Sequence, residues 1–245
     1  MEIVVDIDRK ELKGSVLITG FRGFGMVGYL VSKYLALLLN ARKIGYILLE
    51  RTPPMILIEE DGVGYPFDIY YSENPKAVIV VNRALPDKDL IDDYAAGLAS
   101  WASRIGVRYA VLVGGLSRDY MSEGEEYGYR HVENRFYDGP SLEAPRMEQG
   151  LGVMGPLALL YVYMDYFGVP ATIVLPYSTV EEADYLASAT GVRIIAEKLL
   201  GVKVDVSLLE NLAQKQKEAL QKLLEIMVSE EKGEEEKKEG SGIYM

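Results

Sequence analysis

The sequence predicts a soluble, three-layer α/β/α protein in which helices cover both faces of a mainly parallel sheet. Short apolar segments alternate along the chain with longer segments whose apolar residues recur at helical spacing. The short segments are continuously apolar, which is typical of strands buried on both faces of a parallel sheet. Together these two observations favour an α/β class over an all-helical or all-strand protein.

The N-terminal half begins with an expected strand at Ser15–Thr19, which breaks into a glycine-rich turn and then the helical pattern of Tyr29–Leu39. A second strand is expected at Ile44–Leu49, because two prolines follow it and end it. Residues Met55–Tyr71 have the pattern of a hairpin with an acidic, glycine-containing turn. Its returning arm is expected at Phe67–Tyr71.

The middle of the chain continues the alternation. A buried strand is expected at Lys76–Val81, a helix with an apolar stripe at about Asp87–Ile105, and another buried strand at Val107–Val113. A polar, tyrosine-rich stretch, Leu116–Gln149, follows, and the alternation of Tyr127–Tyr137 within it predicts a short strand. Because α/β proteins usually keep their sites in long loops at the ends of strands, this stretch is a candidate site region.

Regular structure returns in the C-terminal part. We expect a helix that ends near Phe167, a strand at Ala171–Leu175, and two further helices at about Val180–Thr190 and Val192–Leu200. These elements complete a predicted α/β domain that spans residues 1–206.

Residues 207–228 are predicted to form a separate amphipathic helix with Ser207 as its N-cap. Its apolar stripe would pack either on its own domain or on a neighbouring subunit, since both bury the same face. Residues 229–245 are predicted to be a flexible, charged tail, because their composition offers almost nothing to bury against the entropy of ordering. Three residues, Ile243, Tyr244 and Met245, end this tail.

Composition restricts the function classes. The formal net charge of -11 and the lack of a basic stripe argue against nucleic-acid binding. The chain has no cysteine, which excludes disulfides and thiolate chemistry. It also shows no signal stretch or apolar run long enough to span a bilayer, so we expect a cytoplasmic protein without a membrane anchor.

A dinucleotide-binding pattern is present in the glycine turn. Gly23, Gly25 and Gly28 follow a strand and open a helix, and Glu50 ends the next strand at the spacing of a ribose-binding acid. The alternative is that the glycines allow a tight turn and close packing of helix on sheet. We favour packing, because the prolines after Arg51 crowd the ribose position and no hydride-transfer residues follow.

Other catalytic patterns are weaker still, and we expect no catalytic residues, no cofactor and no metal site. The only histidine, His131, lies beside Arg130 and Glu133, where a surface or hydrogen-bonded role is commoner than acid–base catalysis. The remaining candidate is an anion site formed by Arg22 and the glycine turn. The glutamates of the polar stretch are expected to be solvated: Glu123, Glu125 and Glu126.

Several of these segments together resemble the proteasome assembly chaperone 2 family, in particular its archaeal members. The resemblance rests on the glycine turn from Gly23 to Gly28, the helix behind it, the segment Gly150–Gly155 and the helices after Thr179. The family's turn often carries Asn where this chain has Met26. The order of these segments along residues 1–228 supports the resemblance more than any one of them.

The resemblance implies a phosphorylase-like fold, no catalysis, and homo-oligomers that bind the proteasome or a related assembly. Proteins of that system commonly end in a hydrophobic residue, a tyrosine and any residue, and Ile243-Tyr244-Met245 fits this rule. By that resemblance Ile243 enters an apolar pocket between proteasome α-subunits, Tyr244 packs and hydrogen-bonds there, and the Met245 carboxylate pairs with a pocket lysine.

Two function classes follow from the sequence. The first is a non-enzymatic chaperone or adaptor that docks through its tail, and the second is a nucleotide- or nucleoside-handling enzyme that uses the glycine turn. Three terminal residues bury little area, so each tail would bind weakly, and an oligomer would multiply the effect. A third option is a scaffold whose tail is occluded inside the oligomer.

Overall fold

The computed structural model describes residues 1–59 and 62–222. By its internal contacts the chain divides into two units, Met1–Val206 and Ser207–Met245. The predicted docking residues Ile243, Tyr244 and Met245, the predicted tail and the last six residues of the predicted C-terminal helix lie outside the described residues. Within the described part, no helix is long and apolar enough to cross a membrane.

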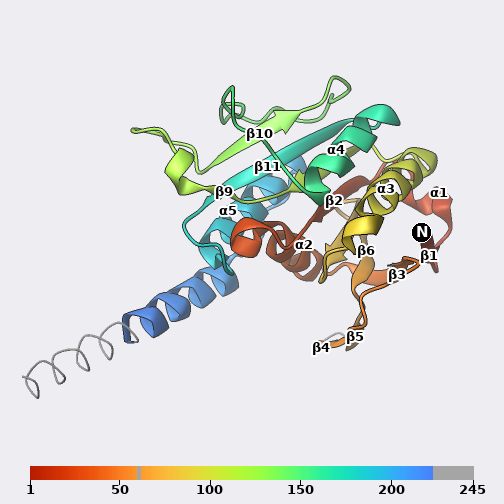
Figure 1. The fold of residues 1–245 in the computed structure, drawn as a ribbon, viewed down its shortest axis with the longest axis horizontal. Helices are drawn as coiled ribbons and strands as arrows, with labels where there is room; N and C mark the ends of the chain where they lie inside the picture. The colour runs from red at the N-terminus through yellow and green to blue at the C-terminus, as the bar shows by residue number, and fades with distance from the viewer. Residues whose placement is uncertain (60–61, 223–245) are drawn as a thin grey trace, which may run out of the picture. The chain divides into compact units, whose positions relative to one another are not determined.

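Unit 1 is built around one mixed sheet, and the predicted mostly parallel α/β arrangement is confirmed (Figure 1). Four neighbouring strands at its centre, β7, β2, β8 and β11, are parallel, and antiparallel strands flank them on both sides. Across the sheet the strands are, in order, β1 (Glu2–Val5), β3 (Arg42–Leu48), β6 (Phe67–Ser72), β7 (Ala77–Asn82), β2 (Val16–Gly20), β8 (Tyr109–Val113), β11 (Ala171–Ser178) and β10 (Tyr129–Glu133), with the short β9 (Leu116–Ser117) beside β11.

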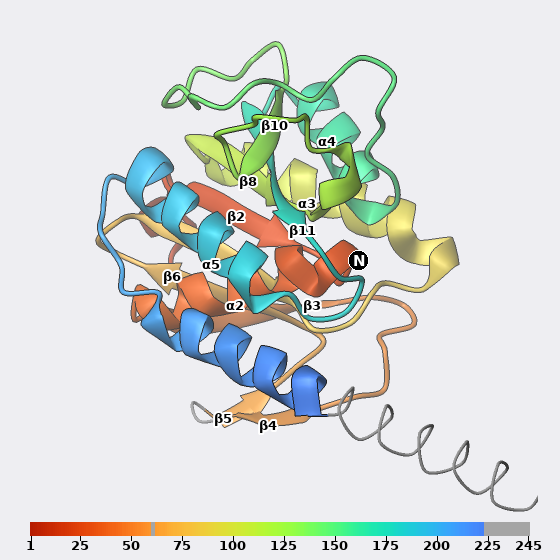
Figure 2. The same ribbon diagram turned by 90° about the vertical axis from the view of Figure 1, so that its left-hand side faces the viewer.

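Helices cover both faces of this sheet, so the three layers are also confirmed (Figure 2). On one face α2 (Val27–Leu38) packs beside α5 (Tyr185–Ile194), which continues through a π-helical turn to Leu199. On the other face α3 (Ile91–Ile105) packs beside α4 (Pro156–Tyr166). The short α1 (Arg9–Leu12) follows β1. Each of the four central strands is buried along its whole length, which explains their continuously apolar sequences.

A chain of buried polar groups crosses the centre of the sheet. The Thr19 hydroxyl donates to the carbonyl oxygen of Val80 at 3.1 Å, and the Asn82 amide nitrogen donates to the Thr19 hydroxyl at 2.9 Å. The Tyr94 hydroxyl of α3 then donates to the Asn82 amide oxygen at 2.5 Å. Thr19, Asn82 and Tyr94 are fully buried, and each has a hydrogen-bond partner. The polar groups that they bury are therefore hydrogen-bonded within the protein.

The hairpin expected at Met55–Tyr71 is partly wrong. The chain does turn back on itself, but the two arms are β4 (Leu57–Glu59) and β5 (Gly62–Gly64), which form a small sheet of their own. Residues of β6 instead enter the main sheet between β3 and β7. Because every residue of β6 is buried, this segment is better stabilised by two neighbouring strands than by one short hairpin arm.

Two further expectations need correction. The N-terminal strand β1 had no predicted counterpart, since its four residues mix charge with apolar side chains at an edge of the sheet. The two helices expected after Val180 are one continuous helix that begins only at Tyr185. The Asp184 carboxylate accepts a hydrogen bond from the Ala187 amide at 2.9 Å, and this N-cap fixes the start.

The described part of unit 2 is a helix over residues 207–222, in agreement with the first four turns of the predicted amphipathic helix. Leu209 is buried and Leu212 is half-buried, as expected for the apolar stripe. Further along, Gln216 and Ala219 are exposed, so the stripe is buried only near its start.

Candidate functional site

The glycine turn between β2 and α2 is tied to the chain segment after β11. Gly25 adopts a left-handed conformation with a φ of 64°, and its amide donates to the carbonyl oxygen of Glu181 at 3.0 Å. In return the Asp184 amide donates to the carbonyl oxygen of Gly25 at 2.9 Å. A Cβ at Gly25 would press on the Ser178 side chain. Gly25 is therefore required both by its backbone conformation and by its neighbours.

The start of α2 is closed by the protein's own backbone. The Val27 amide donates to the carbonyl oxygen of Phe24, and the Tyr29 amide donates to that of Phe21 at 3.2 Å. A Cβ at Gly28 would collide with the carbonyl oxygen of Val113 and lie 2.8 Å from the Phe21 nitrogen. A pyrophosphate is held by free amides at a helix N-terminus, and two of the amides in this first turn are already paired.

Glu50 is not placed as the dinucleotide pattern requires. It follows β3, which is separated from β2 by β6 and β7, so three strand spacings of ~4.8 Å, roughly 14 Å in all, lie between the two strands. In the dinucleotide arrangement the acid follows the strand next to the glycine strand. The contacts of Gly25 and Gly28 thus favour the packing role, whereas Gly23 has an ordinary φ of -101° and open space where a Cβ would lie.

Arg22 is exposed beside the glycine turn and lies 3.9 Å from the Met26 sulfur of that turn. Its guanidinium donates to the carbonyl oxygen of Arg83 at 3.2 Å and lies 5.6 Å from the centre of the Tyr29 ring. The carbonyl oxygen and the aromatic ring are both groups that favour a cation, so they hold the Arg22 guanidinium beside the turn.

Several charged residues of the polar stretch after β8 form ion pairs. The Arg130 side chain is buried between Glu125 and Glu148, to which it donates hydrogen bonds, so the expectation that Glu125 is solvated is wrong. The hydrogen bond that Arg130 donates to Glu125 lowers the pKa of Glu125, although burial opposes this. Glu123 and Glu126 are exposed, as expected.

His131 is buried, not on the surface. Its Nε2 lies 3.5 Å from a carboxylate oxygen of Glu133, which also pairs with Arg146. Burial lowers the pKa of His131, and the nearby Glu133 only partly offsets this, so the imidazole is neutral at pH 7. Among residues 1–59 and 62–222, no three acidic or histidine side chains are grouped to hold a metal ion.

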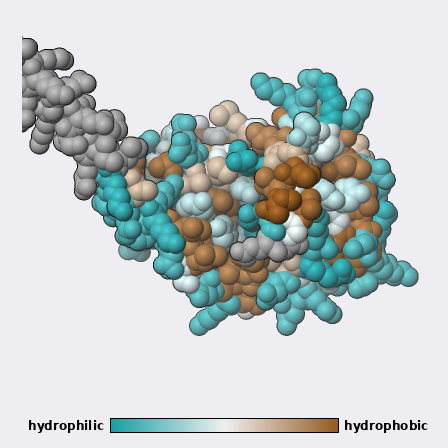
Figure 3. All heavy atoms as spheres, turned by 90° about the horizontal axis from the view of Figure 1, so that it is seen from below, coloured by the Kyte–Doolittle hydropathy of each residue, from teal (hydrophilic) through white to brown (hydrophobic). Residues whose placement is uncertain are grey.

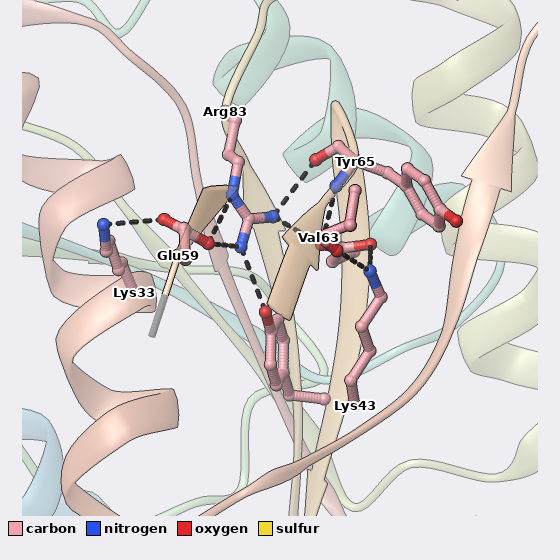
Figure 4. A network of polar contacts seen from close by, with 8 residues as sticks. Lys33, Lys43, Glu59, Val63, Tyr65 and Arg83 are labelled. Carbon is pink, nitrogen blue, oxygen red and sulfur yellow. Dashed lines mark hydrogen bonds and ion pairs between the residues drawn. The ribbon is translucent and has the colours of Figure 1, made fainter. Parts of the chain in front are cut away.

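A buried charge cluster around Arg83 was not found from the sequence. Arg83 follows β7 and is 2% exposed, yet it donates to Asp68 at 2.6 Å, to the Tyr70 hydroxyl at 3.0 Å and to Glu59 (Figure 4). Two lysines extend the cluster: Lys33 reaches Glu59 at 2.7 Å and Lys43 reaches Asp68 at 2.7 Å. Sequence alone gives one weak signal, a polar and then a charged residue, Asn82 and Arg83, directly after an apolar run.

The two carboxylates of this cluster differ in their acidity. Burial alone would raise the pKa of Glu59, but hydrogen bonds from Arg83 and Lys33 outweigh it and leave the pKa below its ordinary value of 4.5. Burial raises the pKa of Asp68, and the hydrogen bonds from Lys43 and the Tyr65 amide do not fully offset it. Asp68 therefore depends on its cationic neighbours to remain ionised.

Comparison with known proteins identifies the family. The model of the PAC2 family matches residues 17–224, most of the chain, including the glycine turn and, apart from Val16, the strands of the parallel centre. The chain belongs to the PAC2 family. No curated protein matches it.

Solved structures share the fold of this PAC2 protein at low sequence identity. Pyrococcus furiosus PbaA, an archaeal homolog of proteasome-assembly chaperone, has 20% identity and a TM-score of 0.77 over 99% of both chains. Pyrococcus furiosus PbaB, an archaeal proteasome activator, has 21% identity and a TM-score of 0.70 over 91% of this chain and 98% of its own. A Mycobacterium tuberculosis proteasome-assembly chaperone homologue has 15% identity and a TM-score of 0.61 over 84% and 94%.

Exchanging glycines of the turn for alanine tests their packing role. We expect Gly28→Ala to lower the free energy of unfolding by about 1–3 kcal/mol, because the new methyl group overpacks a backbone contact. Gly23→Ala is the matched control and should change it by under about 0.5 kcal/mol, because the position is open. Urea denaturation of both variants measures the difference. Equal losses would contradict the packing role of Gly28.

Removing Arg83 tests the buried charge cluster. Arg83→Met should lower the free energy of unfolding by about 3–5 kcal/mol at pH 7, because it leaves the Asp68 charge without its buried partner. Arg51→Met is the matched control: Arg51 also contacts two carboxylates, Asp87 and Asp89, but is 57% exposed and should cost under about 1 kcal/mol.

The pH dependence of the Arg83→Met effect has a defined sign. Glu59 has a lowered pKa, so its stabilisation is present above pH 4.5 and is lost as the pH falls through its folded pKa. Asp68 has a raised pKa, and losing the attraction to Arg83 raises it further in the variant, so protonation of Asp68 as the pH falls relieves the variant more than the wild type. Both effects reduce the difference in free energy of unfolding between wild type and variant as the pH falls from 7 to 4. Denaturation experiments at several pH values measure this difference. A constant gap would show that the loss comes from packing alone.

Proposed function

We propose that this PAC2 protein is a non-enzymatic, homo-oligomeric chaperone or adaptor that docks on the α-subunits of the proteasome core, or on a related assembly, in the cytoplasm. The contacts are assigned to the last three residues, Ile243, Tyr244 and Met245. Family membership over residues 17–224 carries the proposal. Folds like those of a proteasome-assembly chaperone homolog and a proteasome activator support it.

The terminal sequence supplies the chemistry of docking. Ile243 offers an aliphatic side chain and Tyr244 a ring with a hydroxyl group, and in this proposal Met245 would offer a terminal carboxylate. An apolar pocket with a lysine at its edge would accept all three groups. Before them, residues 229–242 are charged and end in Gly-Ser-Gly, a composition suited to a tether.

Several tails on one oligomer would compensate for the weakness of each. Three residues bury too little area to bind tightly alone, because association first loses translational and rotational freedom. Once one tail is bound, the others bind at a raised effective concentration, which strengthens overall binding by about 10²–10⁴. The proposal therefore requires an oligomer that leaves its tails accessible.

The geometry of the glycine turn supports the non-enzymatic part of the proposal. Its amides contact the chain's own carbonyl oxygens, and Glu50 lies three strands from the turn. The enzyme alternative predicts that a dinucleotide, a nucleoside or phosphate raises the melting temperature, because a ligand of the native state stabilises it. A rise with any of these ligands would reopen that alternative.

Changing the C-terminus tests the docking role. Deleting Ile243–Met245 should weaken binding to isolated proteasome core particles at least about tenfold, with the oligomer unchanged in size by light scattering. Adding one glycine after Met245 is the sharper variant, because it keeps all three side chains and moves only the carboxylate. Tyr244→Phe is the mild control and should retain most binding. Unchanged binding after the deletion, measured by surface plasmon resonance, would refute tail docking.

A further inference from the structure

The helix α4 is apolar on almost every side, although one of its sides faces solvent. Asp165 is the only charged residue in its sequence. Leu160 is buried against the core, whereas Val162 is 58% exposed and Tyr166 is 75% exposed. A helix that is apolar all round is normally buried all round, and exposed apolar surface often marks an interaction site. The outer side of α4 is therefore a candidate contact surface.

The neighbouring helix α3 has a different pattern on its outer side. Its exposed or half-buried residues at helical spacing include Asp93, Ala96, Ser100 and Arg104. The two charged residues are exposed, and the two small residues between them are half-buried. Small side chains let another helix approach closely. Within the described residues, neither Asp93 nor Arg104 pairs with an opposite charge.

Hydrogen bonds join α3 and α4 into one continuous face. The Tyr163 hydroxyl of α4 donates to the Asp92 carboxylate of α3 at 2.9 Å. Near the other end, the Ser103 hydroxyl of α3 donates to the carbonyl oxygen of Phe167 at 3.3 Å. Figures 1 and 2 both show the two helices side by side. The face therefore combines large apolar side chains on α4 with a strip of small ones on α3.

The order of charges along α3 favours a second copy of this chain as the partner. Asp93 lies near the start of the helix and Arg104 near its end, about 16 Å apart along the axis, with Ala96 and Ser100 between them. When two copies meet antiparallel through α3, Asp93 of each copy lies opposite Arg104 of the other. The same residues then serve both sides of the contact, as an interface with two-fold symmetry requires.

We propose that the outer face of α3 and α4 is the interface between two copies of this chain, which pair antiparallel through α3 and bury Val162 and Tyr166 of α4. This inference rests on the homo-oligomer of the proposed function, but not on its proteasome partner. The opposite charges fix the alignment of the copies, whereas burial of the apolar side chains supplies most of the binding free energy. Tyrosine suits such a position, because its ring packs while its hydroxyl stays hydrated.

Exchanging the two charges tests the alignment. Asp93→Arg alone places arginines opposite each other and should raise the dissociation constant of the oligomer at least about tenfold. Arg104→Asp alone places aspartates opposite each other and should have the same effect. The double variant restores opposite charges and should return the dissociation constant to within about threefold of the wild type. Sedimentation velocity of the full chain over a concentration series measures all of these constants.

Exchanging an apolar residue tests the contribution of α4. Val162→Asn should raise the dissociation constant at least about tenfold, because each copy loses a buried aliphatic side chain. Ile58→Asn is the matched control. Ile58 is 81% exposed, but it lies on β4, in the hairpin that Figures 1 and 2 draw at the opposite end of unit 1 from α4. Figure 3 views the hairpin side and shows apolar surface there too, yet this variant should leave the oligomer unchanged.

The outcomes separate this interface from the proposed function. A wild-type chain that stays monomeric at about 100 μM would overturn both the interface and the proposed homo-oligomer. A dissociation constant unchanged in Asp93→Arg and Val162→Asn would overturn the interface alone, and so would equal weakening by Ile58→Asn. A double variant as weak as either single charge variant would overturn the antiparallel pairing.

Discussion

The arrangement of unit 1 depends on one place where three backbone segments meet too closely for side chains. The first turn of α2 lies against the ends of β2 and β8, and a Cβ at Gly20 would lie 2.6 Å from the carbonyl oxygen of Gly28. The carbonyl oxygen of Val113 on β8 faces both glycines. Because β2 and β8 form the middle of the parallel centre, this contact determines how closely the α2 and α5 layer approaches the sheet.

The same contact accounts for the chemistry of the turn. In dinucleotide-binding folds, glycines after the first strand let the backbone approach a pyrophosphate. Here they let the start of α2 approach the neighbouring strand β8. The carbonyl oxygens of the turn accept hydrogen bonds from the first amides of α2. The same glycine spacing can therefore serve ligand binding or internal packing. The two cases differ in whether the backbone closely approaches a ligand or a neighbouring strand.

The sequence predicted those features that depend on local pattern. The strands of the parallel centre were recognisable because burial on both faces requires continuous apolar runs, and α3 because its apolar stripe has helical spacing. Strand pairing was harder to predict from local sequence. The segment Phe67–Ser72 could equally form the second arm of a short hairpin or a strand between β3 and β7. The Arg83 cluster joins residues as distant as Lys33, Glu59 and Arg83, and no spacing rule connects them. The proposed docking residues, Ile243, Tyr244 and Met245, lie outside the described residues.

The buried chain from Thr19 through Asn82 to Tyr94 has a consequence for how the central strands align. Parallel strands whose side chains are mostly apolar, such as β2 and β7, have little in their apolar residues to distinguish one alignment from the next. A shift of two residues keeps the same face buried, but it separates Thr19 from Asn82 and leaves buried polar atoms without partners. Each such atom costs about 1–3 kcal/mol, which is large against the small net stability of a folded chain. The three polar side chains thus select one register for β2 and β7, whereas their apolar residues alone would allow several.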